Sequence, residues 1–361
     1  MLTNSASFYD RTRGARKVSV VDLGFLGDTV HLVPALWEIK RSYPQAALHV
    51  LTSTVGAQVL SLVPCVDRAW SMEMDPEKRT LIEQWRVLRA LRRERFDVSF
   101  NFSGADRSVF TTALVGARWR VAHPGGRGHL WNPWLIADWV PRQDPLLAVY
   151  EQRRQMLAAC GLSLNQPVWN LRLPAPAVRG AESLVEAGAI HFSINASSPL
   201  KEWPLAHWIE LAGCLLAADQ GIRIVASGSA SQTEQHRLKA LLIGVDNARL
   251  SVLPPGLPIA ELAAVLQRCR LHVGGDSGVL HLAIALGVPS VSLFREYHDA
   301  SAWIPAGATH RALTVPCRCI NQREQPCAAS GYAECLAGIE PESAAAVIHE
   351  LLTALPPVVH T

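Results

Sequence analysis

Short apolar runs rich in β-branched residues alternate with longer stretches of helical periodicity along almost the whole chain. Parallel strands need a helix or another long crossover between them, so this alternation predicts parallel sheets covered by helices on both faces. Strands are predicted at residues 17–23, 48–51, 68–72 and 97–102 of the first half, and at 192–194, 223–227, 248–252 and 271–274 of the second.

The length of the chain and two segments that break the strand–helix alternation suggest how it is divided into domains. Its 361 residues exceed the length, about 250–300, at which a single hydrophobic core usually stops growing. The segment 118–144 is rich in Gly, Pro, Trp and Arg and reads as loops, and a proline-rich passage follows at 167–176. We therefore expect two Rossmann-like, doubly wound α/β domains, residues 1–170 and 171–340, that face each other across a cleft. The remaining residues, 341–361, are expected to form a C-terminal helix and tail, for which packing back on the N-terminal domain is one arrangement to test.

Composition excludes several classes of protein. Hydrophobic residues make up 49% and charged residues 18%, which is typical of a globular chain. The net charge of +3 provides no global field that would select a nucleic-acid partner. The N-terminus lacks the apolar segment of a secretory signal, and the uncharged run 277–294 is divided by Gly287 and Pro289 into a buried helix and a buried strand. We expect a cytoplasmic protein without a nucleic-acid partner.

The first strand runs into a glycine-containing turn that ends on Asp28. Gly24, Gly27 and Thr29 keep the backbone of this turn open to a polar ligand. On local sequence we favour Asp28 as a helix N-terminal cap. The alternative is a carboxylate that accepts a proton from an attacking hydroxyl, because a general base must project from a fixed element.

Three further strand-to-helix turns carry polar groups. In the loop at 193–203, the amides and hydroxyls of Ser197 and Ser198 together with Lys201 suit a diphosphate, and a solvated polar loop is an equal alternative. Glu234 follows the next strand and suits either a ribose or the first turn of its own helix. The turn at 274–278 offers three candidates followed by a histidine that, taken alone, reads as a core residue: Asp276, Ser277, Gly278 and His281.

Taken together, these turns resemble the ADP-heptose:lipopolysaccharide heptosyltransferases of Gram-negative bacteria, glycosyltransferase family 9, over nearly the whole chain. The resemblance implies a GT-B fold and an inverting transferase. Asp28 in Gly-Asp-Thr-Val matches the family's catalytic carboxylate, and Lys201 in Lys-x-Trp-Pro matches the lysine that contacts the donor diphosphate. The run from Asp276 to His281 matches the Asp-(Thr/Ser)-Gly-x-x-His signature that contacts the donor, and Glu234 falls where an acidic residue binds the adenosine ribose.

The activity that the resemblance implies is transfer of a heptose from ADP-heptose to a saccharide acceptor of the lipopolysaccharide inner core, without a metal or other cofactor. Two departures leave the substrates open: Asp22 stands where relatives carry a basic residue, and 294–297 reads Phe-Arg-Glu-Tyr in place of Phe-Gly-Pro-Thr. The alternatives are a transferase of the same fold that uses another nucleotide sugar or a protein acceptor, and a nucleotide-sugar-binding protein without turnover.

Two clusters lie outside these turns. Four cysteines near the C-terminus resemble a cysteine-rich segment of many relatives; reduced, packed thiols are favoured over a metal site because the first spacing is tight: Cys317, Cys319, Cys327 and Cys335. Arg86, Arg89 and Arg93 share one helical face, which suits solvent, anionic lipid headgroups or a phosphorylated glycolipid acceptor. A peripheral contact with the inner face of the inner membrane would follow from the latter two.

Overall fold

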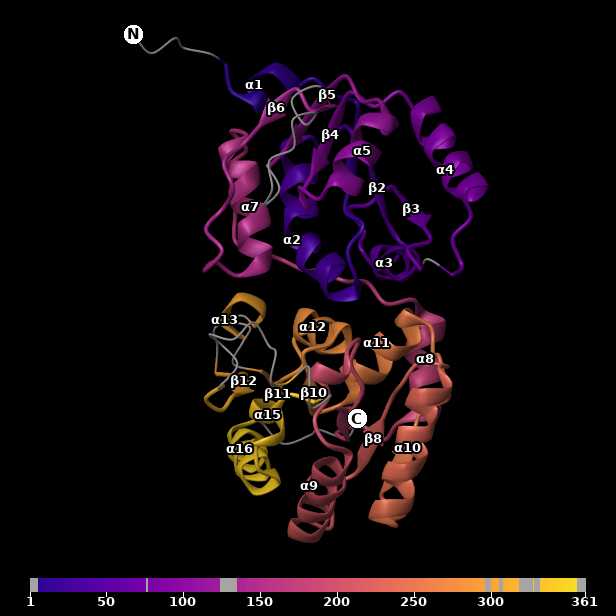
Figure 1. Cartoon of the computed structure of the whole chain (residues 1–361), viewed down its shortest axis with the longest axis vertical. Coiled ribbons are helices and arrows are strands. Elements are labelled where there is room, and N and C mark those ends of the chain that lie inside the picture. Colours follow the sequence, from indigo (N-terminus) through magenta and orange to yellow (C-terminus); the bar gives the residue numbers. More distant parts are fainter. Residues whose placement is uncertain are drawn as a thin grey trace. The chain divides into compact units, whose positions relative to one another are not determined.

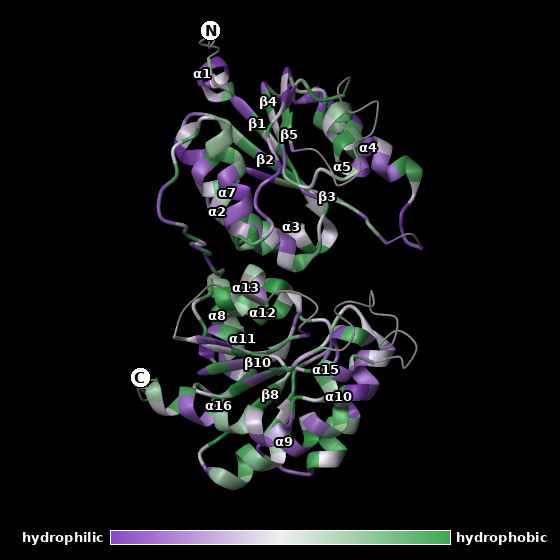
Figure 2. Ribbon diagram, turned by 60° about the vertical axis from the view of Figure 1, so that its left-hand side comes forward, coloured by the Kyte–Doolittle hydropathy of each residue, from purple (hydrophilic) through white to green (hydrophobic). Residues whose placement is uncertain are grey.

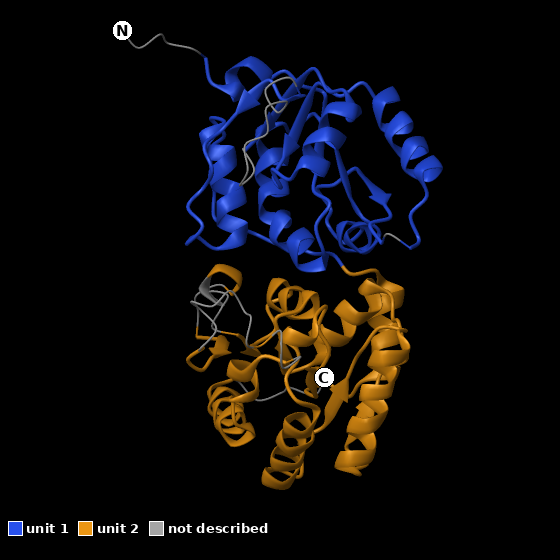
Figure 3. Ribbon diagram, viewed as in Figure 1, with its two compact units in different colours: residues 1–172 blue, residues 173–361 orange. Residues whose placement is uncertain are grey.

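The structure is a computed structural model that describes residues 6–75, 77–123, 135–295, 300–304, 308–317, 327 and 332–355. It consists of two compact units, unit 1 (Met1–Arg172) and unit 2 (Leu173–Thr361) (Figure 3). Each unit contains its own sheet and its own hydrophobic core.

Unit 1 has a six-stranded sheet in the order β3-β2-β1-β4-β5-β6, in which every neighbouring pair is parallel. The strands are β1 (Lys17–Val21), β2 (Ala47–Ser53), β3 (Arg68–Met72), β4 (Val98–Asn101), β5 (Trp119–Ala122) and β6 (Asp138–Trp139). The described helices are α1 (Phe8–Thr12), α2 (Leu26–Ser42), α3 (Thr54–Leu60), α4 (Leu81–Arg93), α5 (Asp106–Val115) and α7 (Val149–Ala159) (Figure 1). The strand order reverses beside β1, which is the Rossmann arrangement that places ligands at the carboxyl ends of the central strands.

Unit 2 repeats the arrangement with the parallel order β12-β11-β10-β7-β8-β9. Its strands are β7 (Ile190–Ser193), β8 (Ile224–Ala226), β9 (Leu250–Val252), β10 (Leu271–Gly275), β11 (Ser290–Leu293) and β12 (His310–Leu313). Its described helices are α8 (Ala175–Leu184), η1 (Pro199–Lys201, a 3₁₀ turn), α9 (Leu205–Ala218), α10 (Gln232–Val245), α11 (Ile259–Arg268), α12 (Gly278–Ala285), α13 (Ala300–Trp303), α15 (Glu334–Ala337) and α16 (Pro341–Ala354).

Both sheets confirm the predicted pair of Rossmann-like, doubly wound α/β domains. Central strands such as β1 are buried on both faces, because helices cover each side, and from Val18 to Val21 every residue of β1 is buried, Ser19 included. Helices such as α10 and α16 carry both hydrophobic and hydrophilic residues along their length (Figure 2). The segment 118–144, read as loops from sequence, contributes two short strands: β5, which pairs with β4, and β6, which forms the edge of the sheet. The predicted cleft between the domains stays a prediction.

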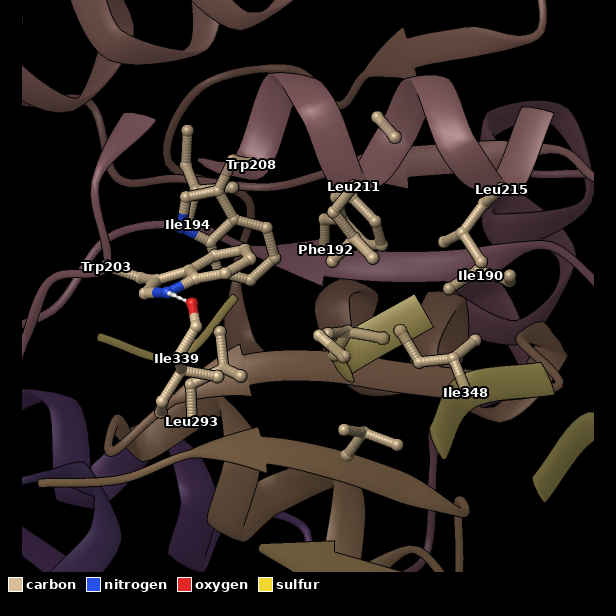
Figure 4. Packing of buried hydrophobic residues seen from close by; sticks show 14 of the residues in the cluster. Ile190, Phe192, Ile194, Trp203, Trp208, Leu211, Leu215, Leu293, Ile339 and Ile348 are labelled. Carbon is tan, nitrogen blue, oxygen red and sulfur yellow. Dashed lines mark hydrogen bonds between the residues drawn. The ribbon is translucent and has the colours of Figure 1, made fainter. Parts of the chain in front are cut away.

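The core of unit 2 is built around two tryptophans. The rings of Trp203 and Trp208 meet edge to face at 5.2 Å, and both side chains are almost fully buried against Phe192 and Leu211 (Figure 4). The indole N–H of Trp203 donates to the carbonyl of Ile339 at 3.0 Å. Without this bond, burial of Trp203 would leave its indole N–H without a hydrogen-bond acceptor.

The C-terminal helix α16 packs within unit 2. Its side chains Ala344, Ile348 and Leu351 are buried in the core that contains Trp203, and the helix lies against α9. Packing of residues 341–361 back on the N-terminal domain stays a prediction. Among the described residues, no helix combines the length and apolarity needed to cross a bilayer.

Candidate functional site

The first candidate residue, Asp28, lies in the first turn of α2 at the carboxyl end of β1. Its Oδ2 accepts a hydrogen bond of 2.9 Å from the amide of Phe25, and this bond closes the start of the helix. The N-cap residue is therefore Phe25 and not Asp28 as favoured from local sequence; Asp28 is the third residue of the helix, and its carboxylate binds back to the N-cap amide. The Asp28 side chain is still 30% exposed and lines a pocket of unit 1, so a ligand can reach it. Gly27 and Thr29 are buried beside it.

Arg153, on α7, bridges Asp28 and Asp22. Its Nη2 lies 2.9 Å from Asp22 Oδ2 and 3.6 Å from Asp28 Oδ1, and its Nη1 donates to the carbonyl of Asp28. The Arg153 side chain is 10% exposed and that of Asp22 is 2% exposed. A charge this deeply buried requires a partner, so the guanidinium compensates Asp22 and at the same time fixes the turn that carries Asp28.

These groups open into a pocket of about 370 Å³ in unit 1. Phe25, which is 79% exposed, stands at the pocket beside Asp28. The lining combines two carboxylates with cationic and neutral hydrogen-bonding groups: Asp22, Asp28, Ser103, His123, Arg142, Gln143, Gln152 and Arg153. The volume is within the range of small-ligand sites, and polar groups converge in it from the carboxyl ends of β1, β4 and β5.

Unit 2 brings together three of the predicted residues. Lys201 Nζ lies 2.6 Å from Asp276 Oδ2, and His281 Nε2 lies 3.6 Å from Asp276 Oδ1. Burial alone would raise the pKa of Asp276, but hydrogen bonds to His281 and Lys201 outweigh it and lower the pKa from 3.8 to about 2. Asp276 is therefore a carboxylate at any physiological pH, and it orients the side chains of Lys201 and His281.

Glycine makes this approach possible. A Cβ on Gly275 would lie 3.0 Å from the carbonyl oxygen of Lys201, and one on Gly274 would lie 2.8 Å from Nε2 of His272. A side chain at position 275 would crowd the carbonyl of Lys201, so glycine there favours the close approach of β10 to the lysine loop. Arg295, Leu293 and Phe294 line the small recess beside Lys201 and Asp276.

The other predicted donor residues occupy neighbouring turns. Ser198 Oγ accepts from the amide of Leu200 at 3.3 Å, whereas Ser197 is exposed. Ser277 precedes Gly278, the first residue of α12, and within the described part of the chain its buried hydroxyl has no hydrogen-bond partner. Glu234 Oε2 accepts from the amide of Ser229 at 2.7 Å, so this carboxylate closes its own turn.

Sequence reasoning missed the arginines that hold these loops. Arg237 on α10 donates from Nε to Asn195 Oδ1 at 3.1 Å and pairs with Glu202 at 3.4 Å, which ties down the loop that carries Lys201. Arg153 has the corresponding role in unit 1. Neither arginine lies in a motif. The one available signal was the position of each arginine on a helix that was expected to pack against a sheet.

Three of the four clustered cysteines pack in the core of unit 2. Cys317, Cys327 and Cys335 are buried in the hydrophobic cluster of unit 2, and Cys319 lies outside the described residues. Over the residues that the structure describes, no group of three or more His, Cys, Asp or Glu side chains is placed to hold a metal ion.

Comparisons with known proteins give a consistent picture. The family described as glycosyltransferase family 9 (heptosyltransferase) matches residues 84–333. The chain is 25% identical to lipopolysaccharide heptosyltransferase 2 of Salmonella typhimurium over 93% of this chain and 99% of that protein. The structure of Escherichia coli ADP-heptose lps heptosyltransferase II superposes with a TM-score of 0.75 at 21% identity, covering 94% of this chain and 99% of that one. E. coli heptosyltransferase WaaC with ADP-2-deoxy-2-fluoro heptose superposes with a TM-score of 0.72 at 22% identity, covering 92% and 99%.

Proposed function

The chain belongs to glycosyltransferase family 9, the heptosyltransferase family, and from this premise we propose that it transfers a heptose from ADP-heptose to a saccharide of the lipopolysaccharide core. The observation that carries the proposal is the cluster of Lys201, Asp276 and His281 at the carboxyl edge of the unit 2 sheet. It occurs in a chain whose fold matches that of a transferase solved with an ADP-heptose analogue.

The donor diphosphate is assigned to the turns of unit 2. Lys201, whose side chain is 29% exposed, offers its ammonium to the phosphates, and the N-terminus of α12 offers backbone amides beside the unpartnered hydroxyl of Ser277. Ser197 and Ser198 add donors from the neighbouring loop. Because these groups are already in place, they stabilise the charge that develops on the departing ADP without reorganisation, and the proposal requires no metal or other cofactor.

The remaining donor contacts are assigned by position. Glu234 would bind the ribose by exchanging its bond to the Ser229 amide for a ribose hydroxyl. Asp276 and His281 hold Lys201 and the start of α12 in register, so they act on the donor partly through the lysine.

The acceptor is assigned to the unit 1 pocket. Asp28 takes the proton of the acceptor hydroxyl, the hydroxyl oxygen bonds to the anomeric carbon, and the bond from that carbon to the ADP oxygen breaks with inversion. Gly27 and Thr29 keep the turn packed, and Arg153 keeps Asp28 oriented. Arg142 and His123 in the same pocket suit the acidic groups of an anionic saccharide. Since such an acceptor is lipid-linked, we place the enzyme on the cytoplasmic side, in peripheral contact with the inner membrane.

The test is direct. The purified chain is incubated with a panel of nucleotide sugars and a delipidated core saccharide, and ADP release and product mass are measured. The expected product carries one added heptose and forms only with the ADP-heptose donor. Product formed from another nucleotide sugar would identify that sugar as the donor in place of ADP-heptose. Nucleotide binding without product from any member of the panel would show that the chain binds nucleotide sugars without transferring them.

A further inference from the structure

Helix α4 of unit 1 presents an exposed apolar end. Leu81, Ile82 and Trp85 are 83%, 67% and 60% exposed, although they are large hydrophobic side chains on a structured helix. Its other face packs normally: Leu91 is buried, and Val87 and Leu88 lie against the core beside it. The exposed residues are therefore on the outer face, and hydrophobic and hydrophilic residues lie side by side along this helix (Figure 2).

The same outer face continues as a row of arginines. Ile82, Arg86, Arg89 and Arg93 follow one another at intervals of four, three and four residues, which keeps them on one side of the helix. Arg86, Arg89 and Arg93 are exposed, and among the described residues no carboxylate lies within ion-pair distance of them. We call the six exposed residues Leu81, Ile82, Trp85, Arg86, Arg89 and Arg93 the α4 face.

Positive charge is concentrated on this segment. Residues 78–95 contain seven basic and two acidic side chains, a net charge of +5, whereas the whole chain carries +3, so the other residues sum to −2. The two carboxylates do not neutralise the arginine row. Glu83 accepts a hydrogen bond from the Thr80 hydroxyl at 2.8 Å in the helix cap, and Glu94 is held by Lys17 at 2.7 Å.

From these observations we infer that the α4 face docks on the surface of an anionic phospholipid bilayer. Leu81, Ile82 and Trp85 enter the boundary between headgroups and acyl chains, and the arginines bind lipid phosphates. An amphipathic helix with an aromatic apolar end and a cationic row has the composition that binds such interfaces. The inference deepens the proposed function, on which it rests for its biological setting, by naming the surface that brings the enzyme to a lipid-linked acceptor.

A second copy of the chain fits this face less well. Most protein dimers are twofold symmetric and place the same patch of each copy against the other. Such pairing would bring the arginine rows of two copies together, and no carboxylate on the face compensates them. An anionic lipid surface supplies phosphate groups that can pair with each arginine of the row.

The experiment measures sedimentation of the full-length chain with vesicles of phosphatidylcholine alone or mixed with phosphatidylglycerol. Wild-type protein is expected to sediment with the anionic vesicles and to be released by salt. The double variant Arg86→Gln/Arg89→Gln should partition on the order of 25-fold more weakly, roughly fivefold for each charge. Its matched control, Arg13→Gln/Arg179→Gln, removes two exposed arginines elsewhere and should bind like wild type.

The apolar end is tested in the same way. Leu81→Ser/Trp85→Ser should lose binding to the anionic vesicles, whereas the control Leu146→Ser/Ile243→Ser, which removes side chains that are 74% and 69% exposed, should keep it. Transfer to the delipidated saccharide should be unchanged in all variants. Absence of transfer in the wild type would count against the proposed function and leave the vesicle result standing.

Several results would overturn the docking surface. These are equal binding to neutral and anionic vesicles, absence of binding by the wild type, and equal losses in test and control variants. A dimer in solution that Leu81→Ser/Trp85→Ser dissolves would assign the face to a second copy, and tight RNA binding abolished by the arginine variant would assign it to nucleic acid.

Discussion

Lys201 and Asp276 lie 75 residues apart in the chain, yet Nζ of the lysine is 2.6 Å from Oδ2 of the aspartate. The pair joins the loop after β7 to the turn after β10, two strands that are hydrogen-bonded neighbours in the sheet. A lysine is a flexible point charge, and a short bond to a fixed carboxylate confines it to one position. An incoming diphosphate therefore meets an ammonium that is already placed.

Replacing this lysine tests its role with the donor. Lys201→Met should lower kcat by roughly 10²–10³-fold, because a preorganised charge on the leaving group is lost. The rate of ADP release at saturating donor is the measurement. Lys239→Met, on the exposed side of α10, is the matched control and should retain wild-type turnover. Equal activity of the two variants would remove Lys201 from the reaction.

Asp28 is tested by removing its charge while keeping its shape. Asp28→Asn should lower kcat by roughly 10²–10⁴-fold and leave ADP binding, measured by calorimetry, unchanged. The asparagine oxygen can still accept from the Phe25 amide, so the melting temperature should change little. Asp10→Asn alters the corresponding capping carboxylate of α1, which accepts from Ser7, and provides the control. Wild-type turnover in Asp28→Asn would show that this carboxylate only caps the helix.

Arg153 is a positioning residue, and its pairing with Asp22 predicts a specific pattern in stability. Arg153→Gln leaves Asp22 buried without a cation and should cost about 3–5 kcal/mol of unfolding free energy. The double variant Arg153→Gln/Asp22→Asn removes the stranded charge as well and should recover much of that loss. Urea unfolding of the four proteins measures the coupling, and additive effects of the two substitutions would contradict the pairing.

The positioning role is separated from a merely structural one by kinetics. Arg153→Lys keeps a cation near Asp22 and should fold, but a single ammonium cannot bridge both carboxylates and the Asp28 carbonyl. We expect a lower kcat with an unchanged KM for the donor. A change confined to the donor KM would place the effect elsewhere.

Buried histidines predict that the protein loses stability in mild acid. His191 and His272 face each other with their Nδ1 atoms 2.9 Å apart, and burial lowers the pKa of His191 from 6.5 to about 3 and that of His272 well below 6.5. Below pH 6.5 the unfolded chain binds protons that these folded histidines do not. Stability is therefore full above pH 6.5 and falls as the pH decreases towards 3, by up to about 1.4 kcal/mol per pH unit for each histidine.

Unfolding free energies measured between about pH 5 and pH 8 check this slope. His191→Gln should have a shallower dependence than wild type, whatever its absolute stability, and the exposed His236→Gln should retain the wild-type slope. Identical slopes in all three proteins would contradict the assignment.

Local sequence was sufficient for the fold and for the turns. The strands at 17–23 and 271–274 were recognisable because each is a short segment rich in apolar residues, and each is followed by glycine at the turn that carries Asp28 or Asp276. Edge strands gave a weaker signal. β6 has two residues, Asp138 and Trp139, and neither periodicity nor composition separates so short a strand from a loop.

The partners of the candidate site were beyond local reasoning. Arg153 and Arg154 are adjacent and chemically identical, yet Arg153 bridges Asp22 and Asp28 whereas Arg154 lies 3.6 Å from the buried Glu38. Which carboxylate each arginine meets is decided by the packing of α7 on α2, more than a hundred residues away in sequence. Pairings of this kind depend on tertiary contacts that no local pattern encodes.

The bond from the Trp203 indole to the Ile339 carbonyl joins two segments of unit 2 that lie 136 residues apart in the chain. Trp203 is the second residue after Lys201, and Ile339 is the second residue before α16. The segment that leads into the last helix thus supports the lysine loop from behind, although that helix contains no candidate for the chemistry. A truncated protein that ended before residue 339 would keep every proposed donor-binding side chain, together with the contacts of Asp276 and Arg237, and would lose the hydrogen bond that anchors Trp203 behind the lysine loop.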